Sequence, residues 1–123
     1  MSALDEAVAE LDAKRSKDEA ERQARHQAAR AFLKGFFDAD IAPSKRLKDS
    51  GVQAAFDGVR ILLQKPDEGV YAQGMMIVVG EQGEIDISGR SLGPVGGAGK
   101  DTKQDMEAKK KELIAEIIAH FSL

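Results

Sequence analysis

The feature that most constrains this chain is a long N-terminal segment that lacks helix-breaking residues. No glycine or proline occurs before Gly35, and the segment is rich in Ala, Glu, Lys, Arg and Gln, which favour helices. Ser2 can cap a helix at its first turn, with Asp5 at the capping-box position. Pro43 disfavours continuation of the helix beyond this region. We therefore predict one helix over residues 2–37.

This helix is longer than the domain that the rest of the chain can build. A helix over residues 2–37 spans about 54 Å, whereas the remainder should form a globule with a radius of gyration of about 12 Å. Between Asp12 and Ala31 no apolar side chain is larger than alanine. The N-terminal half of this helix must therefore project from the domain, fray or pack on another chain. We predict a charged helical arm over residues 1–31 and a single domain over residues 32–123.

Charge is distributed unevenly along this helix. Residues 1–13 carry four acids and no base, whereas residues 14–34 carry seven bases and three acids. Basic side chains recur at a spacing of four, opposite a face of alanines. The basic ladder comprises Arg22, His26, Arg30 and Lys34, and the alanine face comprises Ala20, Ala24, Ala28 and Ala31. We predict that partner contacts on the helix involve Arg22, Arg25, Arg30 and Lys34.

Residues 52–90 predict an antiparallel meander. Apolar residues alternate with polar ones on both sides of Asp57-Gly58, which is a strong two-residue hairpin signal. A glycine-rich connector over residues 93–100 then leads to a second helix over residues 101–122, with Thr102 and Asp105 as its capping box. This helix has one apolar face, formed by Met106, Leu113, Ile114, Ile117, Ile118 and Phe121. The predicted fold class is α+β: a long N-terminal helix, a three- to four-stranded antiparallel meander sheet and a C-terminal helix, with both helices on one face.

The central strand, residues 70–79, is apolar on both faces near its end. This pattern implies cover on both sides of the sheet. We predict that Met75, Ile77 and Val79 make partner contacts through the sheet face. Met75 and Met76 stand on opposite faces, so one of the two should face the helices, and the other, beside Leu62 or Ile77, could form an apolar patch covered by another chain. The sheet face and the long helix are thus the two candidate homodimer interfaces.

The sequence shows no nucleophile–base pair, no cluster of metal ligands and no convincing phosphate loop. Without cysteine it has no thiolate nucleophile or Cys-based metal site, and its two histidines lie on separate predicted helices. The glycine-rich loop fails as a phosphate loop, because Pro94 replaces a required glycine and Asp101 follows Lys100. Glu84 and Asp86 could form an acid–base pair, but a solvated strand face is the simpler interpretation. We expect no enzymatic activity, no cofactor and no bound metal.

Composition also bears on location. The longest uninterrupted apolar run, Met75 to Val79, is far too short to span a bilayer, and the acidic N-terminus is unlike a signal peptide. We expect a soluble cytoplasmic protein without a membrane partner.

A nucleic-acid-binding function is the alternative. The order helix, three strands, helix resembles that of the double-stranded-RNA-binding domain, whose family contacts RNA partly through lysines at the start of its last helix. The resemblance implies RNA contacts by lysines in the comparable region here, where Asp101, Asp105 and Glu107 are interspersed. These lysines are Lys100, Lys103, Lys109 and Lys110.

From the residues themselves, we predict a non-enzymatic protein-binding protein, an adaptor or an inhibitor, that acts through its surfaces as a homodimer. Nucleic-acid binding by the basic ladder or by the lysines of the last helix stays open as the alternative.

Overall fold

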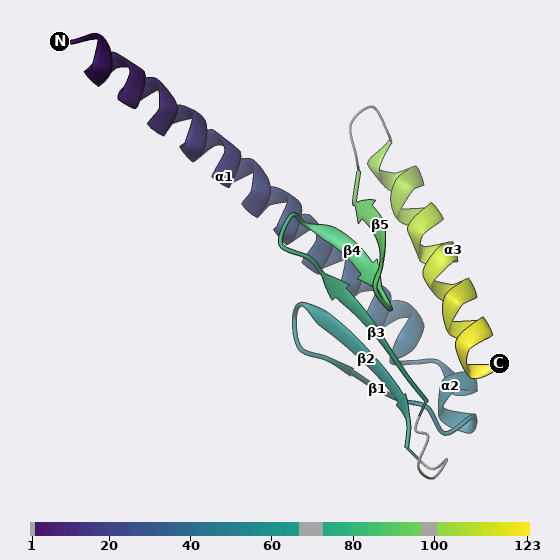
Figure 1. The fold of residues 1–123 in the computed structure, drawn as a ribbon. Helices are drawn as coiled ribbons and strands as arrows, with labels where there is room; N and C mark the ends of the chain where they lie inside the picture. Colours follow the sequence, from purple (N-terminus) through teal and green to yellow (C-terminus); the bar gives the residue numbers. More distant parts are fainter. Residues whose placement is uncertain (1, 67–72, 97–100) are drawn as a thin grey trace.

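The computed structural model describes residues 2–66, 73–96 and 101–123. It confirms an α+β fold in which a long N-terminal helix and a C-terminal helix flank an antiparallel sheet (Figure 1). The helical elements are α1 (Ala3–Phe36), the π-helical turn η1 (Phe37–Ile41), α2 (Lys45–Asp49) and α3 (Thr102–Phe121).

The sheet has five strands in sequence order, each antiparallel to its neighbour. The strands are β1 (Gln53–Phe56), β2 (Arg60–Lys65), β3 (Gln73–Val79), β4 (Glu84–Ile87) and β5 (Arg90–Pro94). The predicted count of three or four strands was therefore low. The extra strand, β5, includes the first residues of the predicted glycine-rich connector. Ser88 and Gly89 both have positive φ, +49° and +85°, which is the geometry of a tight hairpin turn that pairs β5 with β4.

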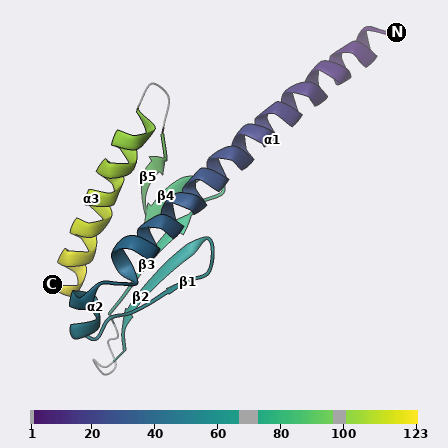
Figure 2. The ribbon, with the colours of Figure 1, turned by 180° about the vertical axis from the view of Figure 1, so that it is seen from behind.

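The hydrophobic core lies between one face of the sheet and the two long helices. Figure 2 shows α1 crossing this side of the sheet, with α3 beside it. Residues of β2, β3 and β4 that share this face are aligned by register, as in the row Ile61, Ile77 and Ile87. The largest fully buried side chains are those of Phe36, Leu33, Ile61, Leu63, Ile77, Ile85, Ile87 and Leu113. The prediction that both helices cover one sheet face is confirmed.

The end of α1 widens into a π-helical turn before the chain reaches Pro43. The backbone N–H of Ala42 donates to the carbonyl of Phe37 (2.8 Å), five residues earlier, as a π-helix requires. This turn buries Ile41 in the core. It also brings Asp40 within 3.2 Å of the Lys110 ammonium on α3.

The C-terminal half of α1 docks on the turn between β3 and β4. Gly83 in this turn lies so close to α1 that a Cβ there would come within 2.7 Å of the Arg25 backbone. Arg22 Nη1 donates to the Glu81 carbonyl (3.2 Å), and Arg25 Nε donates to the Gln82 carbonyl (3.3 Å). The backbones of α1 and the β3–β4 turn therefore approach each other closely at a position where the sequence has glycine.

The N-terminal half of α1 projects from the domain. Every residue from 2 to 21 is exposed, and no hydrogen bond or ion pair within the described part of the chain links this stretch to a residue outside α1. Docking begins at Arg22, and Ala29 is completely buried. The predicted arm boundary at residue 31 thus falls inside the docked part of the helix, and we use "arm" below for residues 2–21.

The start of α3 differs from the predicted capping box. Asp101, rather than Thr102, is the N-cap, and its carboxylate accepts from the N–H groups of Lys103 and Gln104. Asp105 instead turns inward, where it accepts from the N–H of Gly96 (2.8 Å).

Candidate interaction surfaces

The four basic residues predicted on α1 do not form one surface. Arg22 and Arg25 bind carbonyl groups of the β3–β4 turn and thereby hold α1 on its own domain. Arg30 and Lys34 are exposed on another side of the helix, beside Phe56 of the β1–β2 hairpin. Within the described residues, this second pair makes no hydrogen bond to the sheet backbone.

Ion pairs shift the pKa values of two of these four basic residues, Arg22 and Lys34. A hydrogen bond from Arg22 lowers the pKa of the Glu19 carboxyl and raises that of the guanidinium itself. A hydrogen bond to Asp38 (2.8 Å) likewise raises the pKa of the Lys34 ammonium. The first pair lies within α1 and the second joins α1 to η1, and both are exposed, so they are solvated surface pairs that contribute little to stability.

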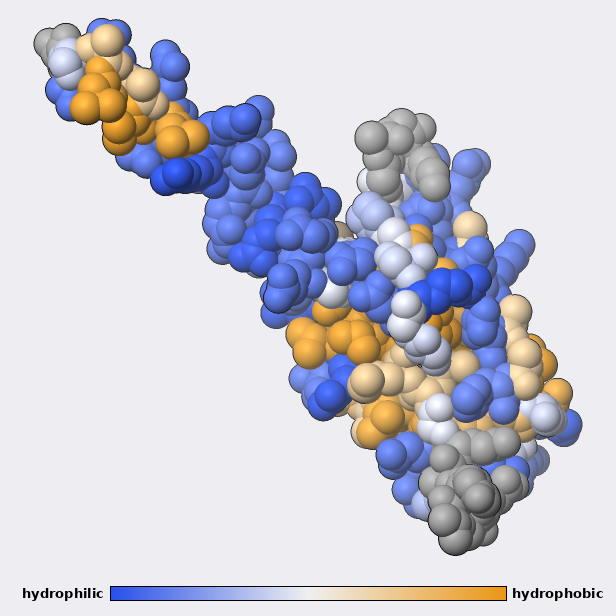
Figure 3. Space-filling view, viewed as in Figure 1, coloured by the Kyte–Doolittle hydropathy of each residue, from blue (hydrophilic) through white to orange (hydrophobic). Residues whose placement is uncertain are grey.

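The arm carries an apolar stripe near its N-terminal end. Leu4, Val8 and Leu11 follow one another at spacings of four and three, so they share one side of the helix. Their exposed fractions are 72%, 48% and 47%. Figure 3 shows the stripe as a hydrophobic patch separated from the domain by a hydrophilic stretch. Large apolar side chains gathered on a projecting helix mark a candidate contact surface.

The outer face of the sheet presents different residues from those predicted. Met75, Ile77 and Val79 point into the core, where they are 4%, 0% and 7% exposed. The prediction therefore chose the wrong side of β3, because strand alternation places residues 75, 77 and 79 together beneath α1 and α3. The uncovered face instead aligns Ala55, Leu62 and Met76 across three strands, with Met76 41% exposed.

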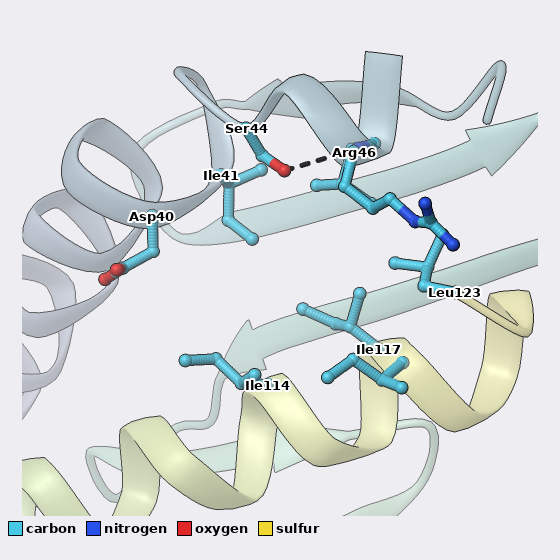
Figure 4. A pocket seen from close by; sticks show the side chains of 9 residues that line it. Asp40, Ile41, Ser44, Arg46, Ile114, Ile117 and Leu123 are labelled. Atoms are coloured by element: carbon cyan, nitrogen blue, oxygen red, sulfur yellow. Dashed lines mark hydrogen bonds between the residues drawn. The ribbon is translucent and has the colours of Figure 1, made fainter. Parts of the chain in front are cut away.

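A groove opens between η1, α2 and α3. It encloses about 310 Å³ and is lined mainly by aliphatic side chains. Figure 4 shows Ile41 pointing from η1 toward Ile114 and Ile117 on α3, with Arg46 and Leu123 at one end. Ile114 and Ile118, 37% and 47% exposed, belong to the apolar face predicted for the last helix. The apolar face of α3 is wider than the part that packs against the sheet. This excess width is the feature of the sequence that could have indicated the groove.

The lysines predicted for nucleic-acid contact are divided between exposed and engaged positions. Lys109 is only 6% exposed, and its ammonium forms a buried ion pair with Asp105 (2.8 Å). Lys110 pairs with Asp40 (3.2 Å), Lys103 is exposed, and Lys100 lies outside the described residues. Because α3 turns Lys109 inward, this residue is not available to a phosphate, and that part of the prediction was wrong.

Within the residues that the structure describes, no cluster of three or more His, Asp or Glu side chains could hold a metal ion. Glu84 accepts from the N–H of Gln82 (3.0 Å) and so stabilises the β3–β4 turn. Among the same residues, none of the helices has the length and apolar character needed to cross a bilayer.

Compared with known proteins, the chain matches no family model, and no curated protein or solved structure is significantly similar to it.

Proposed function

We propose that this chain is a non-enzymatic protein-interaction module that works as a homodimer, with the arm of α1 as its main contact element. The observation that supports this proposal is the complete exposure of residues 2–21 together with an apolar stripe at their outer end. None of these residues is buried against the rest of the described chain. Their apolar side chains are stabilised only when another chain covers them.

The size of the stripe suits a moderate interaction. Full burial of one Leu or Val side chain contributes about 1.5–3 kcal/mol. Leu4, Val8 and Leu11 together thus offer several kcal/mol against the entropic cost of association. Because a twofold dimer contains two arms, the same contact is made twice.

The uncovered sheet face offers a second apolar surface for partners. Leu62 and Met76 are adjacent across β2 and β3, but the patch is bordered by charged and polar side chains. Arg60 at its edge is paired with Asp57 (3.0 Å). We assign this face a secondary role in the proposal.

The test is sedimentation of the full chain at tens of micromolar, compared with a variant that carries Leu4→Ser, Val8→Ser and Leu11→Ser. The proposal expects a dimer mass for the natural chain and a monomer mass for the variant. A matched control carries Ala9→Ser and Ala13→Ser, which change exposed arm positions outside the stripe, and it should remain a dimer.

A single-chain mass for the natural protein at that concentration would overturn the homodimer. A shift of labelled duplex RNA by the monomeric variant at low salt, lost as salt rises, would favour the nucleic-acid alternative instead.

A further inference from the structure

We infer that the groove between η1, α2 and α3 is the receptor for the N-terminal end of α1 from a second copy of the chain. We call residues 2–13 the tip. This inference rests on the proposed homodimer and adds to it the surface to which each arm binds.

The groove and the tip are complementary in apolar character. The tip presents Leu4, Val8 and Leu11 on one side of a helix. In the groove, Ile114 and Ile118 expose more than a third of their surface, although neighbouring α3 positions are buried in the core. Helix recognition in an apolar groove uses this spacing of anchor residues.

Their charges are also complementary. The tip has four acidic side chains and no basic one. The groove is bordered by α2, which carries three bases and one acid over residues 44–50 and whose Arg46 lines the groove. The lining also includes Asp40, but this carboxylate is paired with Lys110 (3.2 Å). The tip acids are Asp5, Glu6, Glu10 and Asp12, and the α2 bases are Lys45, Arg46 and Lys48. None of these seven side chains forms an ion pair within the described part of the chain.

The tip of one chain cannot occupy its own groove. Val8 lies near the start of α1, whereas Ile41 of the groove follows the end of the same helix. At 1.5 Å per residue these positions are about 50 Å apart. The occupant must therefore come from another molecule.

A second copy provides that occupant symmetrically. Because tip and groove lie at opposite ends of α1, two copies whose α1 helices run in opposite directions bring each tip to the other's groove. Such an arrangement is isologous and closes at two chains.

The outer sheet face is a poorer receptor for this tip. It carries Asp86 next to Val78 across β3 and β4, and its nearest base, Arg60, is already paired with Asp57. An acidic helix placed there would meet a carboxylate rather than unpaired bases. Electrostatics therefore favour the groove.

Disulfide trapping in the full-length chain tests the inference, because the natural sequence contains no cysteine to interfere. Equimolar Val8→Cys and Ile118→Cys single variants are mixed in a glutathione redox buffer, and cross-linked species are quantified by mass spectrometry. The inference expects the Val8–Ile118 heterodimer as the main product. In the matched control, Lys111→Cys replaces Ile118→Cys. Because Lys111 is an exposed α3 residue outside the groove, its cross-linking to Val8→Cys should be at least tenfold lower.

The outcomes separate this inference from the homodimer itself. Sedimentation could show a dimer while the main cross-link joins Val8→Cys to Met76→Cys, or Met76→Cys to itself. That result would support the homodimer but contradict the groove as the receptor for the tip. A dimer without a Val8–Ile118 product overturns the groove as well. A monomer by sedimentation overturns both.

Charge reversal supplies a second readout. Arg46→Glu with Lys48→Glu should weaken dimerisation at least tenfold, and Glu6→Lys with Glu10→Lys should do the same. Combining both pairs in one chain should restore most of the affinity, because each reversed tip then meets a reversed groove. If the combined variant is as weak as either pair alone, the proposed pairing of tip and groove is wrong.

Discussion

Asp105 and Lys109 form a buried ion pair in α3, where each side chain is 7% exposed. The Asp105 carboxylate also accepts from the N–H of Gly96 (2.8 Å), so it connects the end of β5 to the first turns of α3. A paired charge is tolerated in this position because its partner and a backbone donor replace the lost water. Removal of either partner leaves the other charge buried.

We expect Lys109→Ala to lower the free energy of unfolding by about 3 kcal/mol, the usual scale for breaking a buried pair. Urea denaturation followed by circular dichroism measures this change. Lys103→Ala provides the control, because Lys103 is exposed on the same helix and its loss should cost less than about 0.5 kcal/mol. Equal effects of the two substitutions would show that the pair is not buried as described.

Asp57 in the β1–β2 turn should make hairpin stability depend on pH. The N–H of Val59 donates to the Asp57 carboxylate (3.1 Å), and this hydrogen bond, with Arg60 alongside, holds the pKa of Asp57 below its ordinary value. A lowered folded-state pKa gives stability that is complete above the ordinary pKa and is lost as pH falls through the lowered value.

The expected result is a stability advantage of the natural chain over Asp57→Asn that is constant near neutral pH and shrinks as the pH falls below the ordinary carboxyl pKa and through the lowered pKa of Asp57. Thermal unfolding at several pH values measures it, with Asp86→Asn as a control for a surface carboxylate on the same sheet. An advantage that grows toward acid pH would contradict the assignment.

At the scale of elements, the decisive contact is that between α1 and the β3–β4 turn. Gly83 has φ +80°, and a Cβ there would approach the Arg25 backbone to 2.7 Å. Neither the helix backbone nor the turn can yield as a flexible side chain would. This glycine therefore sets how closely α1 lies on the sheet.

Gly83→Ala should lower the free energy of unfolding by about 3 kcal/mol, from the positive φ and the backbone clash together. Gly89→Ala separates the two causes. Gly89 also has positive φ (+85°), but a Cβ there meets nothing within 4 Å, so we expect a loss of only about 1 kcal/mol. Chemical denaturation measures both variants. Equal losses of stability would contradict the backbone clash at Gly83.

The same scale shows what periodicity in the sequence can and cannot predict. Alternation predicted the first four strands but missed β5, which has no buried residue. The buried residues of β2, β3 and β4 form one apolar row on each strand, hidden from water. Alternation could not decide which row of β3 faces the helices, since Met75 and Met76 are equally apolar. Likewise, the apolar face of the last helix predicted the buried Leu113 but not that Ile114 would border a groove, because this depends on where α2 lies. Long-range packing, rather than local pattern, settles these points.

For the whole molecule, the main property is the division of α1 into a docked half and a projecting half. The sequence predicted this division from the length of the helix relative to the size of the domain, and from the lack of any apolar side chain larger than alanine between Asp12 and Ala31. It placed the boundary too late, because the contacts of Arg22, Arg25 and Ala29 depend on a tight turn far away in the sequence.

Truncation should reproduce this division. A chain that begins at Ala20 retains all docking contacts, so its free energy of unfolding should match that of the full chain within about 0.5 kcal/mol. A chain that begins at Gly35 loses the buried Ala29, Phe32 and Leu33 and should not fold. Urea denaturation is measured at a concentration low enough to keep every chain monomeric. A folded chain from Gly35 would contradict the core described above.

The measurement that tests the central claim most directly is amide hydrogen exchange of the full chain at low and at high protein concentration. If the arm binds a second copy, amides of residues 3–21 should exchange quickly in dilute solution and become protected at tens of micromolar. Amides of the buried end of α1, from Ala29 to Phe36, should be protected under both conditions. Arm amides that exchange equally fast at both concentrations would contradict the claim that another chain covers the arm.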